Sequence, residues 1–241
     1  PAENQTYYAI WTPTVYTIVF DSQGGTDVAD ITAPYLSAIT APAAPTKEGY
    51  TFGGWATTAA PTVKIDLPIE MPLNGAAYIA IWNVETYNIV WNNEGQTVTG
   101  ENFPATAIYN STISSPAMTN TGYTFLGWEY AGTVYAAGKE MTIADAGNDG
   151  ATITMNAKWS PNTYNAIFYL DNAKTQKYAT VPTVFGQTIE MPDDPTKDGH
   201  EFNGWDNDAT VMGAGDMEFI ADWTPILYFV EFYNADEEVI Y

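Results

Sequence analysis

The sequence contains no cysteine and no arginine, a single histidine, and no apolar run of the roughly 20 residues that a membrane span requires. Without cysteine, disulfides and thiolate metal sites are excluded. The lone imidazole of His200 cannot build a histidine-based metal site, and no nucleophile signature accompanies it. It occupies a tyrosine position of the repeat described below, so we interpret it as a substituted strand residue.

Positive charge is also scarce. Seven lysines face 29 acidic residues, which gives a net charge of −22, and charged residues make up only 15% of the chain. Such a field repels nucleic acid and anionic lipid, and the missing arginine removes the usual phosphate fork. Nucleic-acid binding is therefore excluded. Hydrophobic residues at 46% and aromatic residues at 15% predict a folded protein with a core.

The dominant feature is an internal repeat. One marker is a Gly-x-x-Phe-x-Gly-Trp segment, at intervals of 122 − 49 = 73 and 199 − 122 = 77 residues: Gly49–Trp55, Gly122–Trp128 and Gly199–Trp205. A second is a strand that ends in Ala-x-Trp, at intervals of 82 − 11 = 71, 159 − 82 = 77 and 223 − 159 = 64, and it ends at Trp11, Trp82, Trp159 and Trp223. A third is an alternating strand a few residues later: Tyr16–Phe20, Tyr87–Trp91, Tyr164–Phe168 and Tyr228–Phe232. The markers keep one order at one period.

These markers predict the domain boundaries. Repeats extend over 14–84, 85–161 and 162–225, preceded by the end of an earlier repeat at 1–13 and followed by the start of a later one at 226–241. We therefore expect the chain to be part of a longer array, which also fits the polar residues at its start and the lack of a signal peptide. The linkers are only a few residues long, so neighbouring repeats should touch and form a semi-rigid, elongated rod.

Within a repeat, the sequence predicts a mainly β (α+β) unit. Alternation such as Tyr16-Thr-Ile-Val-Phe20 indicates a half-buried strand. The Ala- and Pro-rich stretch Ala41–Thr46 reads as a crossover that is either extended or one helical turn. Gly54 should bend the strand and turn Trp55 to a new angle. The third repeat has 223 − 205 = 18 positions between its two tryptophan markers, against 27 and 31, which predicts the loss of an edge strand or a loop.

All eight tryptophans occupy repeat positions. They could form an exposed row that stacks on sugar rings, but a unit of about 70 residues has little core, so we favour a core role. The predicted core residues share the positions of the Phe-x-Gly-Trp and Ala-x-Trp markers: Trp11, Phe52, Trp55, Trp82, Phe125, Trp128, Trp159, Phe202, Trp205 and Trp223.

The combined pattern resembles the Listeria–Bacteroides repeat, also called the internalin B-repeat. The resemblance is carried by Ala44–Trp55 (Ala-Pro-Thr-Lys-Glu-Gly-Tyr-Thr-Phe-Gly-Gly-Trp) and by Asp194–Trp205, while the second repeat departs from it at Thr119–Gly122. It implies tandem small β-grasp, ubiquitin-like units in bacterial surface proteins, used as stalks, spacers and adhesion segments. No catalytic residues are known for the unit, so none are carried over.

Calcium is the one cofactor that the sequence suggests. Asp145, Asp149, Asp206 and Asp208 lie in Gly- and Asn-containing stretches with the oxygen density of a calcium loop. Neither stretch matches the EF-hand pattern or recurs in the other repeats, and solvated turns are the alternative interpretation. Lys47 and Lys197 are equivalent residues in turn-like surroundings, which argues against a lysine–asparagine cross-link.

The sequence thus favours a non-catalytic stalk or spacer of an extracellular, cell-surface or cell-wall protein. Its partners would be other domains of that protein. Two alternatives stay open: the repeats bind a host or environmental glycan or protein, or they self-associate into a filament through open strand edges. A domain of a glycan-degrading enzyme is a third interpretation, but small units offer no obvious cleft for a carboxylate pair.

Overall fold

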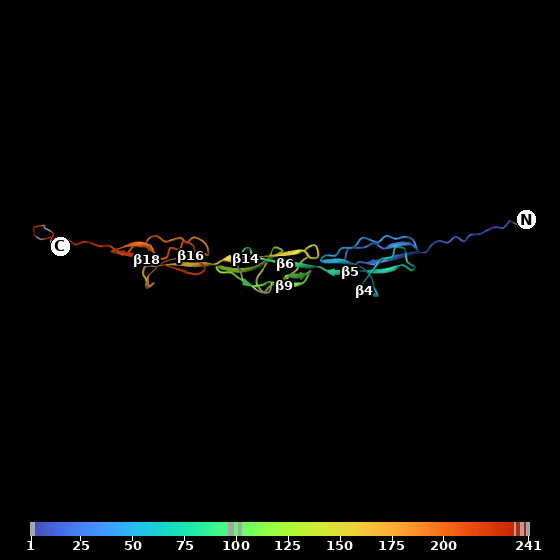
Figure 1. The fold of residues 1–241 in the computed structure, drawn as a ribbon, viewed down its shortest axis with the longest axis horizontal. Coiled ribbons are helices and arrows are strands. Elements are labelled where there is room, and N and C mark those ends of the chain that lie inside the picture. Colours follow the sequence, from blue (N-terminus) through green and yellow to red (C-terminus); the bar gives the residue numbers. More distant parts are fainter. Residues whose placement is uncertain (1–2, 96–98, 101–102, 234, 237–238, 240–241) are drawn as a thin grey trace. The chain divides into compact units, whose positions relative to one another are not determined.

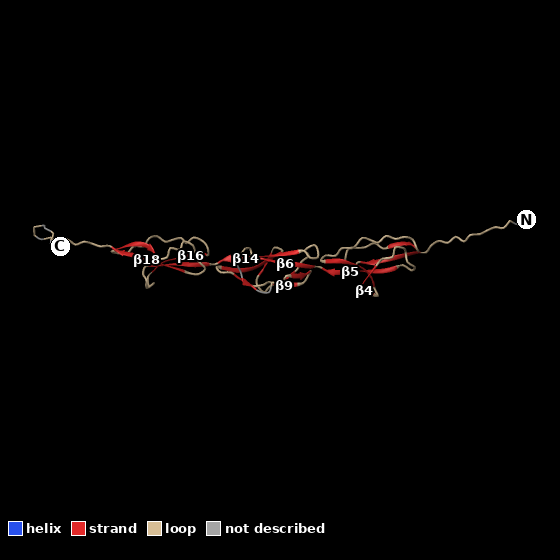
Figure 2. Ribbon diagram, in the orientation of Figure 1, coloured by secondary structure: helices blue, strands red, loops and turns tan. Residues whose placement is uncertain are grey.

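The structure is a computed structural model, and it describes all residues except 1–2, 96–98, 101–102, 234, 237–238 and 240–241. Among the described residues every regular element is a strand, and none is a helix (Figure 2). No helix in this part of the chain has the length and hydropathy needed to span a bilayer. The mainly β prediction is confirmed and its α+β qualification is wrong, because the crossover Ala41–Thr46 runs without any helical turn.

The chain divides into two compact units. One comprises the described residues of Pro1–Asn92, Asn102–Ser115 and Gly138–Asn156. The other comprises those of Asn93–Glu101, Pro116–Ala137 and Ala157–Tyr241. The contacts discussed below lie within one unit or the other.

The first sheet has five strands in the order β2-β1-β5-β3-β4. Two of them, β4 and β5, are labelled in Figure 1. Its strands are β1 (Val15–Asp21), β2 (Ile31–Pro34), β3 (Tyr50–Thr57), β4 (Ala60–Ile65) and β5 (Ala76–Val84). The first and last strands pair in parallel at the centre, and the other neighbours are antiparallel. In β1 the side chains of Ile18 and Phe20 are buried while Thr17 and Val19 are exposed, as the alternation predicts.

The second sheet repeats this arrangement in the order β12-β11-β14-β6-β8. Its strands are β6 (Thr86–Asn92), β8 (Thr106–Ile108), β11 (Tyr123–Tyr130), β12 (Thr133–Tyr135) and β14 (Thr152–Pro161), with β6 and β14 parallel. Two short antiparallel pairs accompany it: β7 (Thr99–Gly100) with β10 (Met118–Thr119), and β9 (Thr112–Ser114) with β13 (Glu140–Thr142).

The third sheet has four strands in the order β16-β15-β18-β17. They are β15 (Thr163–Tyr169), β16 (Lys177–Val184), β17 (His200–Trp205) and β18 (Met217–Pro225), with β15 and β18 parallel. No strand corresponds to β4 or β12 between Trp205 and Met217, where every residue is described. The prediction that the short third repeat lacks an edge strand is therefore confirmed.

The first and the third sheet each cover an apolar cluster of their own. The cluster under the first sheet contains Ile18, Phe20, Trp55, Met71, Tyr78 and Ala80. The cluster under the third contains Ala166, Phe168, Ile189, Met212 and Phe219. A β-bulge between Phe52 and Gly54 in β3 recurs between Phe202 and Gly204 in β17, so the strand bends immediately before the tryptophan, as predicted for Gly54.

Candidate functional site

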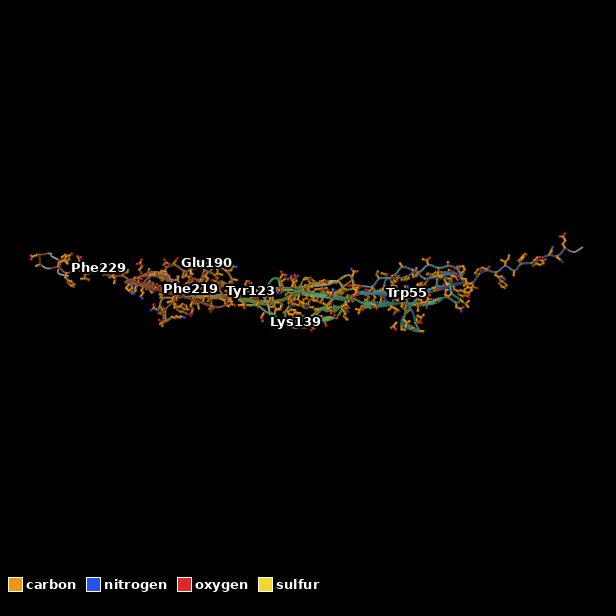
Figure 3. All side chains as sticks on the ribbon, viewed as in Figure 1. Trp55, Tyr123, Lys139, Glu190, Phe219 and Phe229 are labelled. Carbon is orange, nitrogen blue, oxygen red and sulfur yellow. The ribbon has the colours of Figure 1, made fainter. Side chains whose placement is uncertain are left out.

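The tryptophans of the Gly-x-Trp marker face the interior of the repeats. Trp55 is 5% exposed and Trp128 fully buried, whereas Trp205 is half-buried. Each packs edge-to-face on the phenylalanine three residues before it, with ring centroids 5.3 Å (Phe52), 5.6 Å (Phe125) and 5.2 Å (Phe202) apart. In Figure 3 the Trp55 side chain lies among the strands of the first sheet. The buried indoles of Trp55 and Trp128 therefore offer no open face to a sugar.

The tryptophans that end the last strand are half-buried and are engaged on two sides. The indole N–H of Trp82 donates to the Ser22 carbonyl at 2.8 Å, and that of Trp223 to the Leu170 carbonyl at 3.0 Å. The ammonium of Lys47 lies 5.7 Å from the Trp82 ring, and that of Lys197 lies 5.5 Å from the Trp223 ring. A cation on the ring competes with a sugar for the same π surface.

Two residues of the predicted core set behave differently. Trp11 is 87% exposed and belongs to no strand, so its assignment to a core does not match the structure. An indole is buried only where its strand joins a sheet, and the described residues before Val15 pair with none. Trp159 is half-buried against Phe125, at a centroid distance of 4.9 Å, and its indole nitrogen is buried without a hydrogen-bond partner among the described residues.

A polar concave surface lies where the first sheet passes into β6. A single residue, Glu85, links β5 to β6 there. The cleft beside it has a volume of about 470 Å³, and its lining runs from Pro45 to Phe52 and adds Glu85, Asp145, Gly147 and Asn148. Lysine, carboxylate, amide and aromatic groups converge on it, so this cleft is the candidate binding surface of the first unit.

Glu85 is buried, with 7% exposure, and its carboxylate joins two sides of the linker. Oε1 lies 3.4 Å from the Thr51 hydroxyl on β3, and Oε2 accepts the Tyr87 hydroxyl of β6 at 2.8 Å. The same hydroxyl lies 3.0 Å from Oδ1 of Asp145, so one proton is shared between two carboxylates. Burial, and then the hydrogen bond to Glu85, raise the pKa of Tyr87 far above its ordinary value, which keeps the hydroxyl protonated.

The link between β14 and β15 has the same design in the second unit. Asn162 takes the place of Glu85, and its Oδ1 accepts the Thr124 hydroxyl at 2.6 Å. Its amide nitrogen lies 3.3 Å from the Tyr164 hydroxyl. An uncharged amide therefore replaces the carboxylate.

The carboxylates of three predicted calcium residues accept hydrogen bonds from backbone N–H groups. Asp145 accepts the Gly147 N–H at 2.8 Å, Asp149 the Thr86 N–H at 2.7 Å, and Asp206 the Ile220 N–H at 2.6 Å. Among the described residues, no group of three or more His, Asp or Glu side chains is arranged to hold a metal ion. The geometry lends the calcium hypothesis no support, and for these residues and Asp208 it stays a prediction.

One set of contact residues escaped the sequence reasoning. Tyr35, Tyr109 and Phe185 each follow the second strand of a repeat and lie in a turn just before a residue with positive φ. Their intervals, 109 − 35 = 74 and 185 − 109 = 76, match the repeat period, so this spacing could have revealed them. The side chains of Tyr109 and Phe185 contact the preceding repeat, at Tyr50 and Tyr123. The Tyr35 ring meets Tyr16 of its own sheet.

The fold and these contacts define a class of protein: an array of small all-β repeats that use their aromatic residues internally. The model of the Listeria-Bacteroides repeat domain matches the chain three times, at residues 16–76, 87–146 and 164–227. The chain therefore belongs to the Listeria–Bacteroides repeat family, which confirms the resemblance seen in its motifs.

Curated relatives extend over most of the chain. A "Putative Gly-rich membrane protein" of Evansella cellulosilytica is 31% identical over 240 residues, which covers 95% of this chain and 27% of the relative. A "Putative membrane protein" of the same organism is 30% identical over 88% of this chain and 31% of its own length. Internalin H of Listeria monocytogenes is 32% identical over 61% of this chain and 25% of its own. The chain thus spans about a third or less of each relative.

Proposed function

We propose that this chain is a non-catalytic spacer in an extracellular, cell-surface protein of a bacterium, and that it holds other domains of that protein away from the envelope. The observation that carries the proposal is the internal use of the aromatic residues. Phe52 packs on both Trp55 and Trp82, and the indole N–H of Trp82 is hydrogen-bonded within the repeat. A row of sugar-binding platforms would need the faces of these rings free.

The repeat units of this spacer extend over 14–84, 85–161 and 162–225, and each is a β-grasp-type unit without its helix. The support is the strand order, in which the first and last strands of a repeat pair in parallel at the centre of each of the three larger sheets. Units joined by one residue, such as Glu85, have few free backbone torsions between them, which favours a semi-rigid rod over a loose string.

The membership in the family and the names of the relatives support a surface location. Two relatives carry membrane-protein names and one is an internalin. The net charge of −22 suits a spacer as well, because like-charged chains resist self-aggregation over the screening length of about 8 Å at physiological salt.

A display experiment tests the spacer function. The chain is anchored to a cell surface at its C-terminal end with an epitope at the other end, and residues 85–161 are deleted in a second version. A spacer predicts that antibody access to the epitope falls with the deletion and is not fully restored by a Gly/Ser linker of the same number of residues, since such a linker is a flexible coil. Equal access in all three would refute the proposal.

The second candidate function is ligand binding by the repeats, and the cleft beside Glu85 is the observation that favours it. Its lining combines Lys47, Tyr50 and four carboxylate or amide side chains in about 470 Å³. The whole chain on a glycan array and in pull-downs from host extracts tests this function. A ligand whose saturable binding is lost in Lys47→Ala, and kept in the equivalent Lys197→Ala, would establish the cleft as a binding site.

Self-association is the remaining alternative. The segments outside the sheets expose large apolar side chains, among them Tyr8 at 86%, Ile10 at 95%, Leu227 at 80% and Phe229 at 92%. Phe229 is labelled in Figure 3. Light scattering as a function of concentration separates this alternative from the spacer: a spacer stays monomeric, whereas a filament grows with concentration.

A further inference from the structure

The three turns that carry Tyr35, Tyr109 and Phe185 share one geometry. The residue after each ring has a positive φ: 62° at Leu36, 56° at Asn110 and 75° at Gly186. The same backbone hydrogen bond closes each turn, from Ser37 to Pro34, from Ser111 to Ile108 and from Gln187 to Val184. We name these three aromatic residues the knobs.

Two knobs cover a glycine of the preceding repeat. Tyr109 lies on Gly49, where a Cβ would come within 2.1 Å of the ring, and Phe185 lies on Gly122, where it would come within 2.5 Å. The next residue completes each contact: Tyr50 meets Tyr109 edge-to-face at 5.8 Å, and Tyr123 meets Phe185 at 5.3 Å. We name the pairs Gly49–Tyr50, Gly122–Tyr123 and Gly199–His200 the sockets.

The linker residue is fixed from both sides at each junction. The N–H of Glu85 donates to the Gly49 carbonyl at 2.9 Å, and its carbonyl accepts the Tyr109 N–H at 3.0 Å. At the second junction the N–H of Asn162 donates to Gly122 at 2.8 Å, and its carbonyl accepts the Phe185 N–H at 2.8 Å. The socket glycine, the linker and the knob thus form one hydrogen-bonded chain, and it recurs without change of geometry although Glu85 and Asn162 differ in charge.

In the described part of the chain, the first repeat has a knob that lies on no socket, and the third repeat has a socket that no knob covers. Tyr35 donates its N–H to the Thr14 carbonyl at 2.9 Å, as the other knobs do to their linkers, yet its ring is 40% exposed. At the other end the N–H of Ile226 donates to the Gly199 carbonyl at 2.8 Å, while no heavy atom of the described residues lies within 4 Å of a Cβ built on Gly199.

We propose that knob and socket form the surface that docks one repeat on the next, and that the socket Gly199–His200 takes the aromatic knob of a further repeat of this family. The partner is defined by chemistry on the page: a flat tyrosine or phenylalanine ring, held at a turn 21 to 24 residues after the linker, as 35 − 14, 109 − 85 and 185 − 162 give. The proposal deepens the spacer function, on which its biological use rests, because a docked knob removes the bending freedom of a one-residue linker.

The glycine is the specific requirement of the surface. Only a residue without Cβ lets the ring lie directly on the backbone, and the positive φ of Gly49 and Gly122 favours glycine as well. Gly199 has the same positive φ, 68°, without a ring on it. A comparison of Gly199 with Gly122 therefore separates the need for a positive φ from the need for space under the ring. Alanine at 199 introduces only backbone strain, whereas alanine at 122 introduces that strain and also displaces Phe185.

Spin-label distances test the docking, and the lack of native cysteine makes the labelling clean. Labels at Thr133→Cys on β12 and Thr180→Cys on β16, both exposed, report the second junction. We expect a narrow distance distribution in the parent chain and a severalfold broader one in Gly122→Ala and in Phe185→Ala. The matched controls Gly199→Ala and Tyr35→Ala should leave it narrow. A broad parent distribution, or Gly122→Ala indistinguishable from Gly199→Ala, would overturn the proposal.

The single histidine reports the free socket. We join residues 163–225 as an extra copy after Ile226, so that a second Phe185 ring can reach Gly199–His200, and follow the His200 ring protons by NMR. A docked ring shifts these resonances relative to the same extension carrying Phe185→Ala in the copy. Identical His200 resonances in the two extensions would refute the proposal that an aromatic knob occupies the Gly199–His200 socket. Neither result bears on display of the epitope, so failure of the docking and failure of the spacer function are distinguishable.

Discussion

The five-stranded and four-stranded sheets differ at the edge beside the Gly-x-Trp marker. In the first sheet β4 pairs Ile65 with Trp55, and in the second β12 pairs Tyr135 with Trp128. In the third sheet Trp205 pairs with Ala221 of β18, and no strand lies on its other side. The edge strand covers the indole, so Trp55 and Trp128 are buried while Trp205 is only half-buried.

The third sheet gains pairing at its opposite edge. Strand β16 pairs with β15 over seven residues, from Thr163 to Tyr169, whereas β2 pairs with β1 over four. At the centre, Phe168 stacks on Phe219 at a centroid distance of 4.8 Å, whereas the equivalent Phe20 and Tyr78 rings are 5.9 Å apart. The comparison teaches that the parallel pairing at the centre of the unit is constant, while the pairing at its edges varies.

The largest effect that tests this comparison comes from the tryptophans. Trp55→Ala should lower the free energy of unfolding of its repeat by about 3–5 kcal/mol, because a buried indole leaves a cavity. Trp205→Ala should cost at least about 1 kcal/mol less, since a half-buried ring removes less surface from water. Because several repeats need not unfold in one step, amide hydrogen exchange of β5 and β18 is the measurement.

The control for this pair is Val63→Ala on β4, where the side chain is 57% exposed and the change should stay within about 0.5 kcal/mol. Equal losses for Trp55→Ala and Trp205→Ala would show that the edge strand adds nothing to the burial of the indole, and would break the comparison.

A smaller effect is expected at the glycines that directly precede the marker tryptophans. A Cβ on Gly127 would lie 2.3 Å from the Tyr135 carbonyl oxygen of the edge strand, whereas no heavy atom of the described residues lies within 4 Å at Gly204. Both have a positive φ, so alanine costs about 1–2 kcal/mol of backbone strain at either. Gly127→Ala adds an overpacking cost of about 1–3 kcal/mol, which thermal melts of the two variants should resolve. Matching melting temperatures would argue against a close edge strand.

Much of this edge difference was predictable from the sequence. Alternation placed the central strands, and the count of 18 positions after Trp205 predicted the missing strand. The knobs were not predicted, because Tyr35, Tyr109 and Phe185 follow residues as different as proline, isoleucine and valine, and their role depends on a glycine about 60 residues away in the preceding repeat. The burial of Glu85 was equally invisible, since a linker carboxylate is normally solvated and only its hydrogen bonds to the neighbouring strands hold it inside.

The first strands of the second and third sheets, β6 and β15, also differ in the hydrogen bond that a tyrosine hydroxyl makes to the linker residue. The fully buried Tyr87 hydroxyl bonds to Glu85 at 2.8 Å, whereas the half-buried Tyr164 hydroxyl meets the Asn162 amide at 3.3 Å. Tyr87→Phe should destabilise by about 1.5–3 kcal/mol, because a charged acceptor loses its donor in a buried place. Tyr164→Phe should cost less than about 1 kcal/mol. The shift of the urea midpoint measures both, and a larger shift for Tyr164→Phe would contradict the assignment.

The smallest effect concerns the hairpin that lengthens the third sheet. Asp171 accepts the N–H of Thr175 at 2.8 Å and its hydroxyl at 2.6 Å, and these bonds lower the pKa of Asp171. A folded-state pKa below the unfolded value stabilises the protein above the ordinary value of about 4, and that stabilisation is lost as pH falls through the folded-state pKa. Asp171→Asn should therefore lower the melting temperature slightly at pH 7 and not at all in strong acid. If the melting temperatures of variant and parent still differ in strong acid, the loss comes from packing of the hairpin. The ionised carboxylate of Asp171 would then not be its cause.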